Sequence, residues 1–234
     1  MEAIEVIEHN GYRIEIHRDD NAADRNPLNA DFANGISGII YSSYPIEVSN
    51  GGIELPTLTD ENVNAHSKEI CEALGVSGLL DIPRAYKAMF GCSPAPYAPV
   101  SELVNELYVY AYHNHRDSMK MDMLAGILDI AGIKHFRGVG NGYAQGDWHA
   151  ILLAMDPKVE SEFGDPEEAL AGLASEFCKW RYGDVHGYMV KKPTTCQCCG
   201  NTTYELVDSC WGFISSRDDD SWKYMVEEAK ENCE

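Results

Sequence analysis

The sequence predicts an α+β fold: a single domain, residues 1–234, with a largely antiparallel sheet flanked by three to five helices. Strand and helix patterns are mixed along the chain, without the regular β-α-β alternation that builds a parallel sheet. No internal repeat and no linker rich in Gly, Ser or Pro divides the 234 residues. That length suits one globular domain.

Strands are expected where apolar and polar residues alternate, or where a short apolar run stands alone. The opening residues 4–16 alternate on both sides of Asn10-Gly11. This pair is favoured in type I′ hairpin turns because both central residues need positive φ. Residues 108–112, YVYAY, are assigned to a strand from their aromatic and β-branched content. Further strands are expected at residues 36–48, 147–155, 185–190, 203–207 and 211–214.

Helices are expected where a capping residue precedes an apolar stripe and a glycine follows it. Asp165 before Pro166 is the clearest start, because Asp is a good N-cap and Pro fits the first helical position. Gly183 is expected to end that helix. Other helices are expected at residues 59–74, at 119–131, and from 218 or 221 onward.

The chain is strongly acidic, with 18 basic and 38 acidic residues and a net charge of −20. Neutralising phosphates needs clustered Lys and Arg, so this charge argues against direct binding of nucleic acid. The acidity has two interpretations. It is a solubilising surface, or it presents carboxylates where a basic partner expects phosphates.

Composition also bears on the compartment. No stretch approaches the roughly 20 apolar residues of a membrane span. The first residues, MEAIEVIEHN, carry acids where a secretory signal would carry basic residues. The eight cysteines are therefore expected as free thiols inside a cell, not as disulfides.

Four cysteines fall close together, in a possible hairpin at residues 184–214. Cys196 and Cys199, in Cys-x-x-Cys-Gly, have the spacing of a zinc knuckle. Cys210 is the expected third ligand. Candidates for the fourth are Cys178, His186 and Cys198. A second Cys-x-x-Cys is absent, so zinc and free thiols both stay open, and no other cofactor is expected.

Catalytic candidates are few. His113, His115 and Asp117 form a His-x-His-x-Asp run, with His149 as a further ligand candidate. Two histidines two residues apart would share one face of a strand and could hold a hydrolytic metal ion. The run resembles the first metal-binding loop of metallo-β-lactamase-type hydrolases, although Ser118 stands where the next His of that motif is expected.

Three segments resemble a family of uncharacterised proteins from bacteriophages and other mobile elements. These are GYAQGDW (142–148), GDVHGY (183–188) and DSCWGF (208–213), and YRIEIHRDD (12–20) resembles the family's N-terminal strand. Ala144 and His186 depart from the Ser and Tyr typical of the family. The resemblance implies an accessory protein that works in the host cytoplasm. It carries no established activity.

Three function classes follow. The first, which we favour, is a non-enzymatic inhibitor: a DNA-mimic-like acidic protein that binds a basic nucleic-acid-handling or defence protein of the host. The second is a small metal-dependent hydrolase or nuclease using His113, His115 and Asp117. The third is a structural module with a zinc-stabilised hairpin. Whether the chain is an enzyme, and its oligomeric state, stay open.

Overall fold

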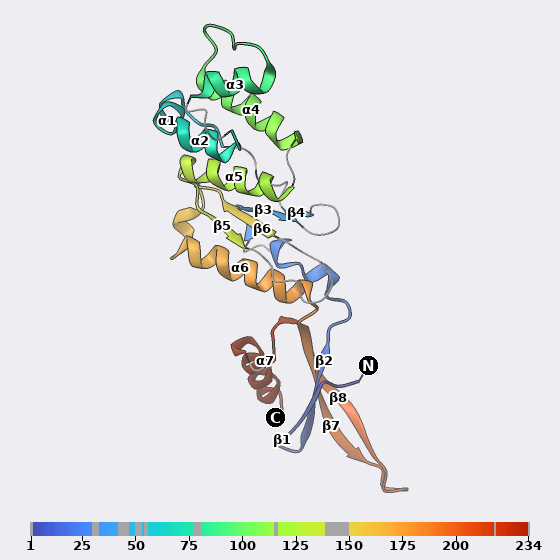
Figure 1. Ribbon diagram of the computed structural model, residues 1–234. Coiled ribbons are helices and arrows are strands. Elements are labelled where there is room, and N and C mark those ends of the chain that lie inside the picture. The colour runs from blue at the N-terminus through green and yellow to red at the C-terminus, as the bar shows by residue number, and fades with distance from the viewer. Residues whose placement is uncertain are drawn as a thin grey trace. The chain divides into compact units, whose positions relative to one another are not determined.

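The fold is α+β, as predicted. The computed structural model describes residues 2–29, 33–41, 47–49, 53, 56–76, 81–114, 117–138, 150–217 and 219–233 (Figure 1). These residues form seven α-helices, where three to five were expected, and eight strands. Every strand pair is antiparallel, which confirms that prediction. The strands form two four-stranded sheets and not the single sheet we expected.

The chain divides into two compact units, and each sheet belongs to one of them. The terminal unit comprises Met1–Asp31 and Ser175–Glu234, and the central unit comprises Phe32–Ala174. The division falls within a continuous helix, α6 (Pro166–Arg181). No Gly, Ser or Pro-rich linker marks such a boundary, so sequence composition gave no sign of it.

The sheet of the terminal unit has the order β1-β2-β7-β8. Its strands are β1 (Glu5–His9), β2 (Tyr12–Arg18), β7 (Val185–Thr195) and β8 (Thr202–Ile214). Asn10 and Gly11 both have positive φ, 50° and 78°, between β1 and β2. The predicted hairpin turn is confirmed. Two short 3-10 turns follow β2, at Ala22–Arg25 and Pro27–Asn29.

The last two strands are longer than their patterns predicted. The two strands expected at 203–207 and 211–214 are one strand, β8, because the ladder with β7 continues between them. Register shifts at His186/Gly187 and at Val190/Lys191 keep that ladder paired. Such bulges bend and twist a strand locally, which hides its alternation in the sequence.

Helix α7 (Asp220–Glu231) closes one face of the terminal sheet. The helix was expected to start at residue 218 or 221, and the side chain of Asp219 caps it by accepting a hydrogen bond from the Trp222 amide. The apolar stripe of α7 packs on the even-numbered side chains of β2 and on β7. Its core residues are Tyr12, Ile14, Ile16, Tyr188, Val190, Trp222, Met225, Ala229 and Cys233.

The sheet of the central unit has the order β4-β3-β6-β5. Its strands are β3 (Ile36–Tyr41), β4 (Glu47–Ser49), β5 (His135–Gly138) and β6 (Ala150–Met155). Every residue of β6 is buried, as expected of a continuous apolar run at the centre of a sheet. Strand β5 was missed, because its four residues show no alternation.

Five helices complete the central unit on the N-terminal side of α6: α1 (Asp60–Ala65), α2 (Ser67–Ala73), α3 (Ile82–Phe90), α4 (Val100–Asn114) and α5 (Asp117–Ala131). The expected helix at 59–74 is two helices separated at His66. Of the two candidate caps at its start, Thr59 and Asp60, Thr59 caps the first helix. Helix α3 was missed, although Asp81 caps it and Pro83 stands in its first turn.

The strand expected at 108–112 is wrong, because these residues continue α4. Leu103, Val104 and Leu107 are buried at helical spacing and override the strand preference of the aromatic residues after them. The side chains of Tyr108 and Tyr110 pack within the helical part of the central unit instead. The Tyr110 ring lies 5.0 Å, centroid to centroid, from the ring of Phe90 in α3.

Helix α5 lies between the helices and the sheet of the central unit (Figure 1). Met123 and Ile127 join the helical core, whereas Leu124 and Leu128 pack against β6. A helix covered on opposite faces has no single apolar stripe. Gly126 allows close packing on α2, since a Cβ there would lie 2.9 Å from Ala73 Cβ.

Helix α6 begins and ends as the sequence predicted. The Asp165 carboxylate accepts hydrogen bonds from the amides of Glu167 and Glu168. Gly183, with φ +76°, ends the segment. A 3-10 turn, Glu160–Glu162, precedes the helix. Among the described residues, no helix has the length and apolar character needed to cross a membrane.

Candidate functional site

The cysteine turn joins β7 to β8, at the end of the hairpin that the sequence predicted. The Cys196 amide donates to the Asn201 carbonyl at 2.8 Å, and the Gly200 amide donates to the Cys196 carbonyl at 2.9 Å. Gly200 has φ +73°, a conformation that favours glycine. These bonds close a six-residue turn whose side chains face solvent.

Three sulfur atoms converge in this turn. Cys196 Sγ and Cys198 Sγ are 2.8 Å apart, and the sulfurs of Cys196, Cys198 and Cys199 all lie within 4.8 Å of one another. This is the one group of three or more His, Cys, Asp or Glu side chains with such proximity in the described parts of the chain. The cluster could hold a metal ion.

The Cys196 thiol is more acidic than the Cys198 thiol. Hydrogen bonds from the Cys198 thiol, and from the backbone amides of Cys198 and Cys199, lower the pKa of Cys196 to about 6. The pKa of Cys198 is raised in turn, because its thiol donates to Cys196. Cys196 is therefore largely a thiolate at neutral pH, which is the form that binds metals.

The structure separates one member of the predicted ligand set from the other two. Cys210 lies on β8 opposite Tyr188 and packs against the core under α7. It stands eight residues beyond Thr202, roughly 26 Å along a strand that rises about 3.3 Å per residue. Cys198, a candidate fourth ligand in the sequence, lies beside Cys196 in the turn. The other two candidates, Cys178 and His186, lie on α6 and at the far end of β7.

His113 does not lie on a strand. It belongs to α4, and Asp117 begins α5, so the strand spacing that suggested a metal site does not hold at His113. His115 and His149 lie outside the described residues. The hydrolase site stays a prediction that has lost the strand on which it was based.

A buried polar group in β2 was missed by sequence reasoning. The Glu15 carboxylate accepts hydrogen bonds from Lys191 Nζ at 2.5 Å and is 3.2 Å from His17 Nε2. Burial alone would raise the pKa of Glu15, but the bonds from Lys191 and His17 outweigh it and lower that pKa. The signal was the alternation of residues 12–18, whose apolar members face α7 and whose polar members face the other side.

His186 is held inside the terminal unit. Its Nδ1 lies 3.2 Å from Ser215 Oγ, and its ring packs edge-on against Trp222, with centroids 5.0 Å apart. Burial lowers the pKa of His186, so the neutral imidazole is favoured. A neutral, hydrogen-bonded histidine within the core serves packing.

A shallow, open pocket of about 520 Å³ lies in the terminal unit. It is lined by Glu176, Gly212, Phe213, Ile214, Asp220, Ser221 and Tyr224. It contains neither the cysteines nor the buried histidines.

Acidic residues are spread over both units. The terminal unit holds 19 acidic and 10 basic residues, a net charge of −9, and the central unit holds 19 and 8, a net charge of −11. The densest run is residues 156–168, with six carboxylates and one lysine in thirteen residues. Most of this run is exposed, on the 3-10 turn and the first turn of α6.

Comparison with known proteins gives no match: no protein-family model, no curated protein and no solved structure is similar to the chain. The resemblance to phage and mobile-element proteins therefore stays an expectation. Of its segments, 142–148 lies outside the described residues, whereas 183–188 and 208–213 lie at the start of β7 and within β8.

Proposed function

We propose that the chain is a non-enzymatic acidic binding protein, an accessory product of a phage or other mobile element. Its partner would be a basic, nucleic-acid-handling or defence protein in the cytoplasm of the host. The observation that carries the proposal is the acidity of both units. A solvated tail or one charged helix would not give −9 and −11 to two separately packed parts.

Residues 156–168, which we call the acidic segment, are the best candidate contact. Glu160, Glu162 and Glu168 take part in no ion pair described for this segment, where Lys134 pairs with Glu167 at 3.0 Å. An exposed carboxylate pair contributes only about 0–1 kcal/mol to binding. Affinity would therefore come from many such pairs, and steering by the summed field would raise the association rate.

The test is binding to a basic host protein under changing salt and charge. A triple variant, Glu160→Lys, Glu162→Lys and Glu168→Lys, should slow association, measured by surface plasmon resonance with the captured partner. The matched control reverses Glu61, Glu69 and Glu102, which are also exposed in the central unit and change the net charge equally. If the acidic segment is the contact, the triple variant should associate more slowly than the control variant.

A second set of binding measurements varies the ionic strength and adds competing nucleic acid. The association rate should fall steeply with ionic strength, because the Debye length shrinks from about 10 Å at 0.1 M to about 3 Å at 1 M. Duplex DNA should compete for the partner, and the chain itself should bind no DNA. A complex indifferent to salt and to DNA would contradict the proposal and leave the acidity as a means of solubility.

The cysteine turn supports a second candidate, a module whose hairpin holds zinc. Thiolates are soft ligands that suit Zn²⁺ better than Mg²⁺ or Ca²⁺. Elemental analysis of protein purified under reducing conditions tests it. About one zinc per chain would support this candidate, and protein free of zinc would count against a resident ion.

A further inference from the structure

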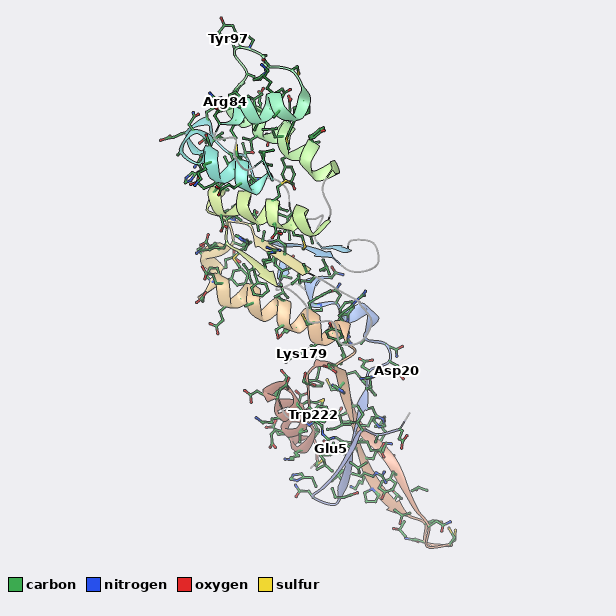
Figure 2. All side chains as sticks on the ribbon, viewed as in Figure 1. Glu5, Asp20, Arg84, Tyr97, Lys179 and Trp222 are labelled. Carbon is green, nitrogen blue, oxygen red and sulfur yellow. The ribbon has the colours of Figure 1, made fainter. Side chains whose placement is uncertain are left out.

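The outer part of the β7–β8 hairpin is paired only with itself. Strand β2 accompanies β7 up to the pair Arg13–Lys191, and beyond it the ladder consists of residues 192–195 and 202–205. Every residue from 192 to 207 is exposed except Cys196, which is half-buried. Figure 2 shows this ribbon ending in the turn that carries the sulfur atoms.

The conformation of the cysteine turn does not depend on a bound ion. Its two backbone hydrogen bonds and the positive φ of Gly200 set its shape, and the Thr195 and Thr202 hydroxyls lie 3.4 Å apart at its base.

The sulfur positions suit a single ion after small side-chain rotations. A zinc ion 2.3 Å from each sulfur would hold tetrahedral sulfur ligands about 3.8 Å apart. The three sulfurs already lie within 4.8 Å of one another. The close pair, Cys196 and Cys198 at 2.8 Å, would have to separate by about 1 Å. Cys198 and Cys199 are exposed, so no packed neighbour opposes such a rotation.

The fourth ligand is not supplied by the turn. Gln197, Gly200 and Asn201 carry no thiolate, imidazole or carboxylate. Among the described residues, no further His, Cys, Asp or Glu joins the three sulfurs within ligand distance. A site with three protein ligands and a free position is open to exchange, whereas structural zinc sites are closed by four.

We propose that Cys196, Cys198 and Cys199 form a three-thiolate site for a thiophilic ion of the Zn²⁺, Cd²⁺ or Cu⁺ class, whose remaining position faces solvent and accepts a ligand from outside the chain. The ribbon holds this site away from the rest of the terminal sheet. An external thiol or imidazole can reach the ion without any change in the fold.

This inference rests on the second candidate function and is independent of the acidic partner. The failure of this proposal can be distinguished from the failure of the resident-zinc candidate, because an exchangeable site can be empty after purification and still bind added metal. The probe is Cd²⁺ alone, titrated into reduced, metal-free, full-length protein. Thiolate-to-metal charge-transfer absorbance reports binding.

We expect one Cd²⁺ per chain at this site. Cys198→Ser should weaken binding by at least the roughly 10–100-fold that loss of an outer-shell partner costs a metal site. The matched controls Cys92→Ser and Cys210→Ser should leave it unchanged. Wild-type affinity in Cys198→Ser would show a two-thiolate knuckle and overturn the proposal, as would loss of binding in Cys210→Ser.

The open position is tested with Co²⁺, whose visible spectrum reports its ligands. Imidazole added to the one-to-one complex should shift the spectrum without releasing the metal. A spectrum that imidazole leaves unchanged would show a closed site and would also overturn the proposal. An unchanged melting temperature of the Cys198→Ser variant confirms that folding is not the cause of lost binding.

Discussion

The indole ring of Trp211 lies directly against the backbone of Gly187, its cross-strand partner in the β7–β8 ladder. A Cβ atom at Gly187 would lie 2.6 Å from Trp211 Cδ2 and 2.6 Å from the Cys210 carbonyl oxygen. Only a residue without a side chain fits. Gly187 and Trp211 come from two segments, 183–188 and 208–213, that are far apart in the sequence, and they meet in a packing contact.

Gly187→Ala should therefore destabilise the terminal unit. Inserting a methyl group into a packed contact costs about 1–3 kcal/mol. Here the added methyl group would collide with the Cys210 carbonyl oxygen as well as with the Trp211 side chain. Urea unfolding measures the loss. Gly172→Ala is the matched control, because Gly172 lies in α6 with no atom within 4 Å of the added Cβ. Alanine should stabilise that helix by up to about 1 kcal/mol. Equal effects at the two positions would contradict the contact.

Asp219 links three segments of the terminal unit. Its carboxylate accepts hydrogen bonds from the Trp222 amide, the Ser216 amide and Lys179 Nζ, at 2.7, 2.9 and 2.7 Å. Asp219→Ala should lower the free energy of unfolding by about 0.5–2 kcal/mol through loss of the cap. Asp219→Asn should cost less, because Asn caps nearly as well and the partly exposed ion pair contributes only about 0–1 kcal/mol.

The pH dependence of stability distinguishes the contribution of the Asp219 charge from that of the helix cap. Burial alone would raise the pKa of Asp219, but the bonds from Lys179, Trp222 and Ser216 lower it. The stabilisation is therefore full above the unfolded-state pKa of about 4 and is lost as the pH falls through the folded-state value. The stability difference between the wild type and Asp219→Asn should vanish in acid. A difference that persists there would contradict the role of the charge.

His186 should make stability fall as the pH drops through the histidine range. Burial lowers the folded-state pKa of His186, so the unfolded chain takes up a proton first, below about pH 6.5. Urea unfolding of His186→Gln should show a weaker loss between about pH 7 and pH 5 than the wild type. His9→Gln, at the end of β1, is the matched control. An unchanged slope in His186→Gln would show that other groups cause it.

Local signals predicted local structure well. The Asn10-Gly11 turn, the Thr59 and Asp165 caps and the glycine stops each depend on chemistry within a few residues, which a sequence displays directly. The strand expected at 108–112 failed because packing of α4 against α3 overrides the strand preference of its aromatic residues. No local feature encodes that contact.

Long-range relationships were beyond the sequence. Cys210 was included in the metal site because it is near Cys199 in number, but a continuous strand separates them. Cys198 was placed last among the candidates because only the folded turn shows its sulfur beside Cys196. The position of Cys198 and the separation of Cys210 both depend on the folded β7–β8 hairpin, which the spacing of cysteines along the sequence does not display.

The pairing of β2 with β7 has a consequence for biosynthesis. Arg13 faces Lys191 across this ladder, and the whole central unit is translated between them. During synthesis from the N-terminus, the β1–β2 hairpin is made first. Most of the chain must be translated before its neighbouring strand, β7, is present. The central unit, whose contacts lie within one continuous stretch, can fold in that interval. The ribosome-bound chain therefore exposes Ile14 and Ile16 until late in translation, the period in which a chaperone would bind it.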